Sequence, residues 1–121
     1  MTSDGQPFTY LLDIVIESDR EYPVTVKVDG RVVVGRVKGD ATDIGLNLSP
    51  YGASERGVSR QHMAFDSDVR GVYIEDLMST SGTRINGALI KPNVRYRLRP
   101  EDEITLGMMR LTVRLIRNAG E

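Results

Sequence analysis

The chain has 121 residues, of which 40% are hydrophobic, and its 16 basic and 17 acidic side chains give a formal net charge of −1. This length is typical of a single domain that buries one apolar core, and we expect residues 1–121 to form one domain. The balanced charge provides no global positive field for phosphate backbones, so we expect no nucleic-acid partner.

The chain contains no cysteine, which excludes disulfides, thiolate zinc sites and thiol catalysis and favours a reducing, cytoplasmic location. No apolar run approaches the roughly 20 residues that a membrane span needs, and residues 1–7 lack the basic and apolar regions of a signal peptide. We therefore expect no membrane insertion, and a flexible N-terminal segment over residues 1–8.

Short apolar blocks rich in Val, Ile and Leu recur along the chain and are interrupted by Gly, Asp, Asn and Pro. This pattern predicts short β-strands, and no stretch keeps helical spacing for three turns. The expected strands, in chain order, are Tyr10–Ile16, Val24–Val28, Arg31–Gly35, Ile44–Leu48, His62–Ser67, Val72–Asp76, Thr83–Ile85, Ala88–Ile90, Val94–Leu98, Glu103–Leu106 and Arg110–Ile116. About 11 strands of this kind predict an all-β fold, a two-sheet antiparallel β-sandwich.

Two turn dipeptides predict tight hairpins. Asp29-Gly30 separates the second and third expected strands, and Asn86-Gly87 separates the seventh and eighth. Both central positions of a type I′ turn need positive φ, which Asn, Asp and Gly tolerate best. We therefore expect each flanking pair of strands to pair with each other.

Two strand-poor stretches, residues 49–60 and 78–84, are rich in Ser, Thr, Gly and Arg. Loops of this composition carry function on many sandwiches, but the same residues also dominate ordinary turns. Composition alone leaves both interpretations open.

Four separated motifs favour the functional interpretation of these loops when they are considered together and in their order along the chain. They are Gly35-Arg36, Ser59-Arg60-Gln61-His62, the segment from Asp76 to Thr83, and Asn86-Gly87. In this order and spacing the chain resembles the forkhead-associated (FHA) family over about residues 32–116, including the ending from Asp102 to Gly107. The resemblance implies an eleven-stranded sandwich of FHA/SMAD-like type, whose loops at one end bind phosphothreonine in a partner protein.

The resemblance assigns phosphate binding to Arg36, Ser59, Arg60 and Thr80. It implies that Arg36 grips the phosphate, that Ser59 contributes both its hydroxyl and its backbone N–H, and that Thr80 contacts the phosphothreonine from the facing loop. A planar guanidinium suits this task because it can hold two oxygens of a doubly charged anion.

The resemblance also implies a peptide-binding set of Ser81, Gly82 and Arg56. Gly82 would leave space beside the threonine methyl group, and Arg56 could reach the position where some members select the third residue after phosphothreonine. Ser81 departs from the family, which usually has an asparagine there to hold the peptide backbone. Serine is shorter and offers one hydroxyl in place of an amide, which puts this peptide contact in doubt.

The supporting residues implied by the resemblance are Gly35, His62, Asn86 and Gly87. His62 would tie the binding loops together, and Asn86 would help to fix the loop that carries Thr80. No metal is expected, because a single histidine without cysteine cannot supply a zinc site.

Two other functions compete with phosphothreonine binding. Ser59, His62 and Asp76 could form a hydrolytic triad, but no Gly-x-Ser-x-Gly motif is present, and residues 35–45 lack the Gly-Lys-Ser/Thr ending of a P-loop. We therefore expect no enzyme and no cofactor. A phosphate-independent scaffold that binds through a sheet face or edge strand is the stronger alternative, favoured by Ser81.

The partner implied by the resemblance is a protein that a Ser/Thr kinase has phosphorylated on threonine. Thr2, Ser3 and Thr9 lie in the expected flexible N-terminus. Their phosphorylation would allow self-association through the same site.

Overall fold

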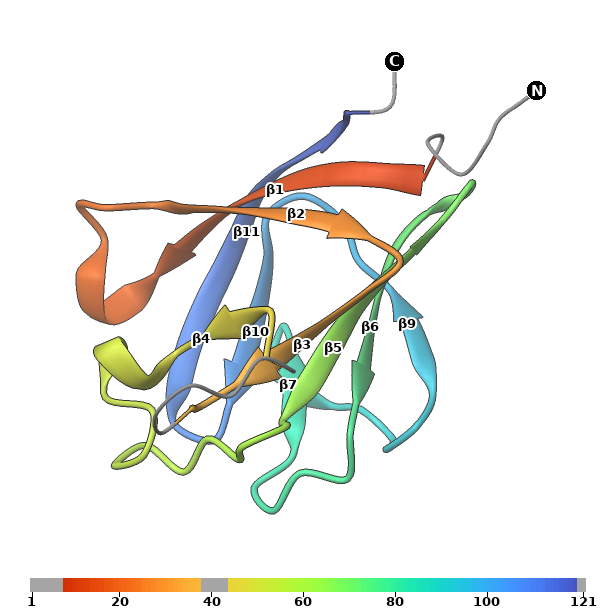
Figure 1. Cartoon of the computed structure of the whole chain (residues 1–121). Coiled ribbons are helices and arrows are strands. Elements are labelled where there is room, and N and C mark those ends of the chain that lie inside the picture. Colours follow the sequence, from red (N-terminus) through yellow and green to blue (C-terminus); the bar gives the residue numbers. More distant parts are fainter. Residues whose placement is uncertain (1–7, 38–43, 120–121) are drawn as a thin grey trace.

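The computed structural model describes residues 8–37 and 44–119, so the expected flexible segment lies outside the described residues apart from Phe8. The described residues form eleven strands, two 3₁₀ helices and no α-helix (Figure 1). In chain order they are β1 (Thr9–Ile16), η2 (Glu17–Asp19), β2 (Val24–Asp29), β3 (Arg31–Gly35), β4 (Leu46–Asn47), η3 (Ser49–Tyr51), β5 (Met63–Asp68), β6 (Gly71–Asp76), β7 (Thr83–Ile85), β8 (Ala88–Leu89), β9 (Arg95–Arg97), β10 (Asp102–Leu106) and β11 (Met109–Asn118). Within this part of the chain, no helix is long and apolar enough to cross a membrane.

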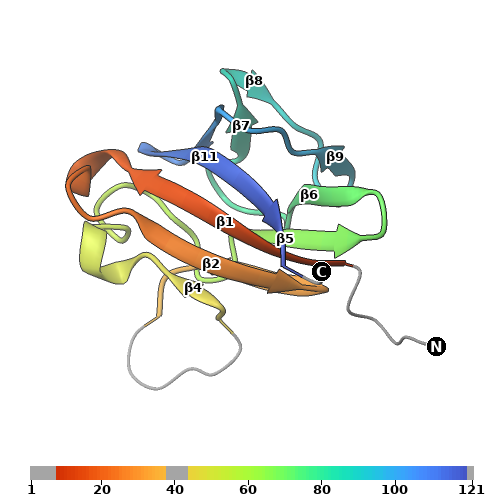
Figure 2. The same cartoon turned by 90° about the horizontal axis from the view of Figure 1, so that it is seen from above.

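The strands form two stacked sheets, which Figure 2 shows from above. The six-stranded sheet has the order β2-β1-β11-β10-β7-β8, and the five-stranded sheet has the order β4-β3-β5-β6-β9. Between the described strands all pairing is antiparallel except between β3 and β4, which run parallel. The predicted two-sheet β-sandwich is confirmed.

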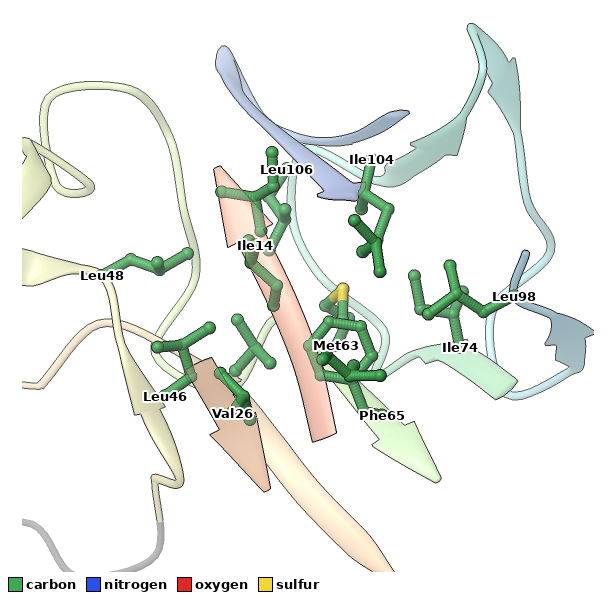
Figure 3. Close-up of a cluster of buried hydrophobic side chains, with 14 of the residues drawn as sticks. Ile14, Val26, Leu46, Leu48, Met63, Phe65, Ile74, Leu98, Ile104 and Leu106 are labelled. Carbon is green, nitrogen blue, oxygen red and sulfur yellow. The ribbon is translucent and has the colours of Figure 1, made fainter. Parts of the chain in front are cut away.

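Alternating side chains of the two sheets fill the space between them. On β1, Leu12, Ile14 and Ile16 are fully buried, and on β5 Met63 and Phe65 face them from the other sheet (Figure 3). The period of two follows from the strand pleat, which points successive side chains to opposite faces. Each such side chain contributes about 1.5–3 kcal/mol of burial, so this layer supplies the rigid base from which the loops project.

The Asn86-Gly87 hairpin is confirmed. Asn86 and Gly87 have φ values of 51° and 87°, and Ile85 pairs with Ala88 across the turn. The two positive φ values are those that a type I′ turn requires.

The predicted pairing across Asp29-Gly30 is wrong. β2 pairs with β1 in the six-stranded sheet, whereas β3 pairs with β4 and β5 in the five-stranded sheet. Of the two turn residues only Gly30 takes a positive φ, and its backbone N–H donates to Oγ of Ser67 on β5 at 2.9 Å. The turn therefore passes the chain from one sheet to the other, because a β5 side chain satisfies its backbone in place of a hairpin partner.

Thr9 also departs from the expectation of a flexible N-terminus. It begins β1, is 7% exposed, and its carbonyl accepts the N–H of Ala119 at 2.8 Å. Thr9 is therefore a strand residue that a kinase cannot reach in the folded chain, while Thr2 and Ser3 lie outside the described residues.

Gly35 brings the end of β3 against the segment that precedes β5. A Cβ atom at this position would lie 1.9 Å from the carbonyl oxygen of Arg60, a distance that no side chain can occupy. The neighbouring backbone bonds Arg36 N–H to Ser59 O at 3.3 Å and His62 N–H to Val34 O at 2.9 Å. The absence of a side chain at Gly35 thus allows the close approach on which the geometry of the next residues depends.

We predict that Gly35→Ala lowers the free energy of unfolding by about 3 kcal/mol, because the methyl group must displace backbone atoms. Gly30→Ala is the matched control, since its Cβ would meet nothing within 4 Å and only the φ of +85° is strained, at about 1 kcal/mol. Urea unfolding of both variants measures the difference. Equal losses would show that the Gly35 contact relaxes without cost.

Candidate functional site

The motif residues gather at one end of the sandwich, the lower end in Figure 1. Arg36 follows β3, Ser59 lies in the connection from β4 to β5, and Thr80 lies in the connection from β6 to β7. The N–H of Thr80 donates to Oγ of Ser59 at 3.1 Å, and Nε of Arg36 donates to the carbonyl of Val58 at 2.6 Å. The structure therefore brings Arg36, Ser59 and Thr80 together from three separate segments.

The Arg36 side chain is partly buried and held at one of its nitrogens. Its Nε bonds Val58 O, while its terminal nitrogens form no hydrogen bond or ion pair with any described residue. The guanidinium is thereby fixed in orientation with its two NH₂ groups left to bind an anion.

Ser59 has its hydroxyl oxygen turned toward the facing loop. Because that oxygen accepts the N–H of Thr80, the hydroxyl proton remains available to donate. Its backbone N–H, which the resemblance assigned to phosphate, instead donates to Nδ1 of His62 at 2.9 Å. In this structure the backbone N–H of Ser59 therefore has a partner inside the protein, and the hydroxyl is the group that is left to donate to a ligand.

His62 is fully buried between the two loops. Its Nδ1 accepts the N–H of Ser59, and its Nε2 lies 2.9 Å from the carbonyl oxygen of Gly82. Since a carbonyl only accepts, Nε2 carries the proton and Nδ1 is the acceptor. Burial lowers the pKa of His62 below 6.5, against the opposing effects of the Gly82 carbonyl and the Asp76 charge.

These bonds also bear on the hydrolytic alternative. Nδ1 of His62 faces the backbone N–H of Ser59, and the Ser59 hydroxyl oxygen faces Thr80. The carboxylate of Asp76 bonds Ser79 and Thr83. The three residues therefore do not form the nucleophile, base and orienting acid of a triad.

Asp76 has a structural function that was not predicted from the sequence. The residue is 1% exposed, and its Oδ1 accepts the hydroxyls of Ser79 at 2.5 Å and Thr83 at 2.6 Å, while Oδ2 accepts the Ser79 N–H at 3.2 Å. The Ser79 hydroxyl oxygen in turn accepts the N–H of Gly82 at 3.0 Å. This network shapes the loop that carries Thr80, and an Asp followed three residues later by Ser was its sequence signal.

Ser81 uses its hydroxyl within the protein. Its Oγ donates to the carbonyl of Gly57 at 2.9 Å and so links the β6–β7 connection to the β4–β5 connection. Gly57, with φ 78°, has no side chain in the way, since a Cβ there would lie 3.1 Å from this oxygen. The residue that replaces the family's asparagine thus closes the two loops onto each other.

The turn between β10 and β11 supports the loop around Arg56. The N–H of Met108 donates to the carbonyl of Arg56 at 2.7 Å. A Cβ at Gly107, whose φ is 62°, would lie 2.4 Å from the same oxygen. The side chains of Arg56 and Arg60 are exposed at the rim, and no local sequence pattern predicts the contact with this turn.

The turn that contains Asn86 and Gly87 supports a different part of the fold from the expected Thr80 loop. The Asn86 amide donates to Asp102 at 2.9 Å and accepts the N–H of Glu103 at 2.9 Å. These bonds tie the β7–β8 turn to β10 and not to the Thr80 loop. Contact with that loop comes through β8, since a Cβ at Gly82 would lie 2.8 Å from a methyl carbon of Leu89.

Comparisons with known proteins agree with this architecture. Residues 32–107 match the family described as FHA domain. The chain is 34% identical over 97 residues to Protein FraH of Nostoc sp., a match that covers 80% of this chain and 32% of FraH, so the chain spans about a third of the length of this curated relative.

Two solved structures are also similar. One, from a structural and functional analysis of phosphothreonine-dependent FHA domain interactions, is 25% identical with a TM-score of 0.67 and covers 87% of this chain and 96% of its own. The other, the FhaA FHA domain complexed with the intracellular domain of Rv3910, is 26% identical with a TM-score of 0.61 and covers 87% and 99%.

The eleven-stranded sandwich with its loops gathered at one end is the fold of a class of protein-interaction modules. Because the family match covers more than half of the chain, this protein belongs to the FHA family, whose members bind phosphothreonine.

We predict that Asp76→Asn destabilises the fold by about 1–3 kcal/mol, because the amide places a donor toward donors that are buried with it. The loss should appear in urea unfolding, together with a shifted NMR signal of the Thr80 amide. Asp19→Asn is the control, because the Asp19 side chain bonds no described residue. An unchanged stability in Asp76→Asn would contradict the importance of the network.

We predict that the stabilising contribution of His62 is complete above pH 6.5 and declines as the pH falls below that value. The unfolded chain then binds a proton that the native imidazole, with its lowered pKa, does not. His62→Gln preserves an acceptor and a donor without titrating. The stability difference between wild type and this variant should therefore shift against the wild type between about pH 7.5 and about pH 5.5.

An NMR titration of the ring provides the direct check. It should place the pKa of His62 below 6.5, whereas a value at or above 6.5 would mean that the ring is not desolvated as the structure has it.

Proposed function

We propose that this chain reads phosphothreonine and recruits partner proteins that a Ser/Thr kinase has phosphorylated. The observation that carries the proposal is the convergence of Arg36, Ser59 and Thr80, with the terminal nitrogens of Arg36 left unbonded among the described residues. The two NH₂ groups of one oriented guanidinium match the spacing of two phosphate oxygens.

The proposed phosphate site combines guanidinium and hydroxyl donors. The NH₂ groups of Arg36 would hold two phosphate oxygens, the hydroxyls of Ser59 and Thr80 would donate to the third and to the ester oxygen, and the exposed Arg60 would add charge at the rim. Phosphate carries about −1.5 to −2 charge near neutral pH, so these charge-assisted bonds dominate the binding. The affinity should fall as salt concentration rises, because the site is open to solvent.

Gly82 accounts for the proposed preference of the site for phosphothreonine over phosphoserine. The absence of a side chain at Gly82 lets the exposed Leu89 side chain lie against the loop, since a Cβ there would be 2.8 Å from its methyl carbon, and this apolar group is the surface that a threonine methyl would contact. Burying one methyl group there adds about 0.8 kcal/mol, which is a several-fold preference.

The peptide backbone is held less firmly in this proposal than in a site with asparagine at position 81. The Ser81 hydroxyl already donates to Gly57, so one or two peptide hydrogen bonds are missing, at about 0.5–1.5 kcal/mol each. In return, the closed loops lose less entropy on binding, because fewer of their residues need to be ordered. In this proposal Arg56, which is exposed at the same rim, would contact residues after the phosphothreonine.

Related domains support the proposal by what is described for them. One similar structure comes from work on phosphothreonine-dependent interactions of FHA domains, and another shows an FHA domain complexed with the intracellular domain of a second protein. A phosphate-independent scaffold remains the competing function, favoured by the internal use of Ser81.

We predict that the purified chain captures phosphothreonine peptides from a degenerate library, with weaker capture of phosphoserine and none of unphosphorylated peptides. Arg36→Ala should lower the affinity at least about tenfold, because it removes two charge-assisted bonds. Isothermal titration with one selected peptide provides the measurement.

Arg20→Ala is the matched control for charge, because Arg20 is exposed on the β1–β2 connection and contacts no described residue of the site. It should leave the affinity unchanged. No capture by the folded wild type, or equal loss in both variants, would favour the scaffold over the phosphothreonine reader.

A further inference from the structure

A second cationic feature lies at the opposite end of the sandwich from the phosphothreonine loops. Arg70, Arg97 and Arg99 line a hollow of about 420 Å³ between the β5–β6 turn, the end of β9 and the start of β1, in the upper part of Figure 1. Strand β5 runs from the His62 end to the β5–β6 turn and rises about 3.3 Å per residue, so the two ends are roughly 17 Å apart. This distance makes the hollow separate from the first site.

The guanidinium groups of these three arginines are not paired with a carboxylate of the described residues. Among the described residues, none of them forms an ion pair. The nearby carboxylates of Asp68 and Asp102 accept the backbone N–H groups of Arg70 and Arg99, each at 2.8 Å, and do not pair with the guanidinium groups. A second oxygen of Asp68 lies 3.8 Å from Nη2 of Arg95, and Glu101 lies 3.3 Å from Nε of Arg114. Three like charges around one hollow repel each other, and this repulsion is relieved when an anion binds.

The Arg97 guanidinium packs against the protein surface. It lies against the backbone of Gly71, where a Cβ would be 2.8 Å from Nε and Nη2, and its central carbon is 5.8 Å from the ring centre of Tyr73. Gly71 takes a φ of 150°, which residues with side chains rarely adopt. The glycine therefore makes room for a planar donor group that is oriented before any ligand arrives.

The floor of the hollow is apolar. Val72 and Leu98 are 1% and 2% exposed, and Ile116 is half-buried. A volume of this size holds two or three side chains rather than a large cofactor. A hollow with three arginines around it and an apolar floor fits an oxyanion with an aliphatic group beside it.

The adjoining edge strand indicates which class of molecule carries that oxyanion. β9 ends the five-stranded sheet, pairs only with β6, and leads directly into Leu98 and Arg99. An edge strand offers unpaired backbone groups to an extended segment of another chain, which a small metabolite cannot use. The neighbouring anion and edge sites thus favour a peptide.

We propose that the Arg70–Arg97–Arg99 hollow is a second binding site, which takes an acidic peptide segment with an aliphatic residue beside its carboxylate or phosphate group. The site works independently of phosphothreonine binding, because it shares no residue with the loops around Arg36. One chain would then hold two partner segments at once, or two parts of one partner.

The test uses the ¹⁵N-labelled chain carrying Arg36→Ala, so that the phosphothreonine site does not contribute. The probes are an acetylated Glu-Glu-Leu-Glu-Leu-Glu peptide, its Gln-Gln-Leu-Gln-Leu-Gln counterpart, and a version with phosphoserine in place of the central glutamate. We expect saturating amide shifts over residues 70–72 and 97–99 with the two acidic peptides and none with the glutamine peptide. The stronger of the two acidic probes identifies carboxylate or phosphate as the preferred group.

Adding Arg97→Gln should weaken the acidic peptide about tenfold, the effect of losing a charge-assisted bond. Arg20→Gln is the control with the same change of charge and should have no effect. The proposal is overturned by the absence of saturating shifts at these residues, by equal weakening in the two variants, or by tighter binding of a single-stranded oligonucleotide at the same residues. Unchanged chemical shifts elsewhere in Arg97→Gln establish that the variant is folded.

Discussion

The two hydrogen bonds of the buried His62 imidazole hold the binding end of this protein together. One bond goes to the backbone of Ser59 and the other to the backbone of Gly82, so a single neutral ring joins loops that follow β4 and β6. A charged ring would present a donor to the Ser59 N–H, and both would be buried without an acceptor. Desolvation keeps the ring neutral and so preserves the only protonation state in which both loops are bound to it.

The loops divide their polar groups between internal structure and an external ligand. The side-chain oxygens of Asp76, Ser79 and Ser81 form hydrogen bonds with the backbone or with one another. These bonds fix the loops without any ligand. Arg36 and Ser59 keep donors that the described part of the chain does not use. This division explains why loops rich in serine and threonine need not be adaptable, since most of their hydroxyl groups already have partners.

The sequence allowed the strands to be predicted because alternating burial leaves a period of two in the residues themselves, as in Leu12, Ile14 and Ile16. It did not reveal that Asp29-Gly30 leads to the other sheet, because positive φ at Gly30 serves a crossing as well as a hairpin. The family resemblance identified Arg36 and Ser59 by position. The internal partner of Ser81 depends on the distance between two loops, and no local pattern encodes that distance.

The pairing of the first and last strands has a consequence for how the chain folds. β1 lies between β2 and β11, and Tyr10 pairs with Asn118, so the centre of the six-stranded sheet joins residues from opposite ends of the chain. For these strands to pair, nearly all of the described residues must first be enclosed in one large loop, and the conformational entropy lost is offset only once the strand contacts form. This requirement places folding in the slow, millisecond-to-second regime of β-rich domains. The five-stranded sheet draws its strands from the continuous segment between β3 and β9, so the residues that pair in it are closer together along the chain than Tyr10 and Asn118. Because β11 follows the other ten strands in the sequence, a ribosome would release it after them, and the sandwich could close only once β11 had been synthesised.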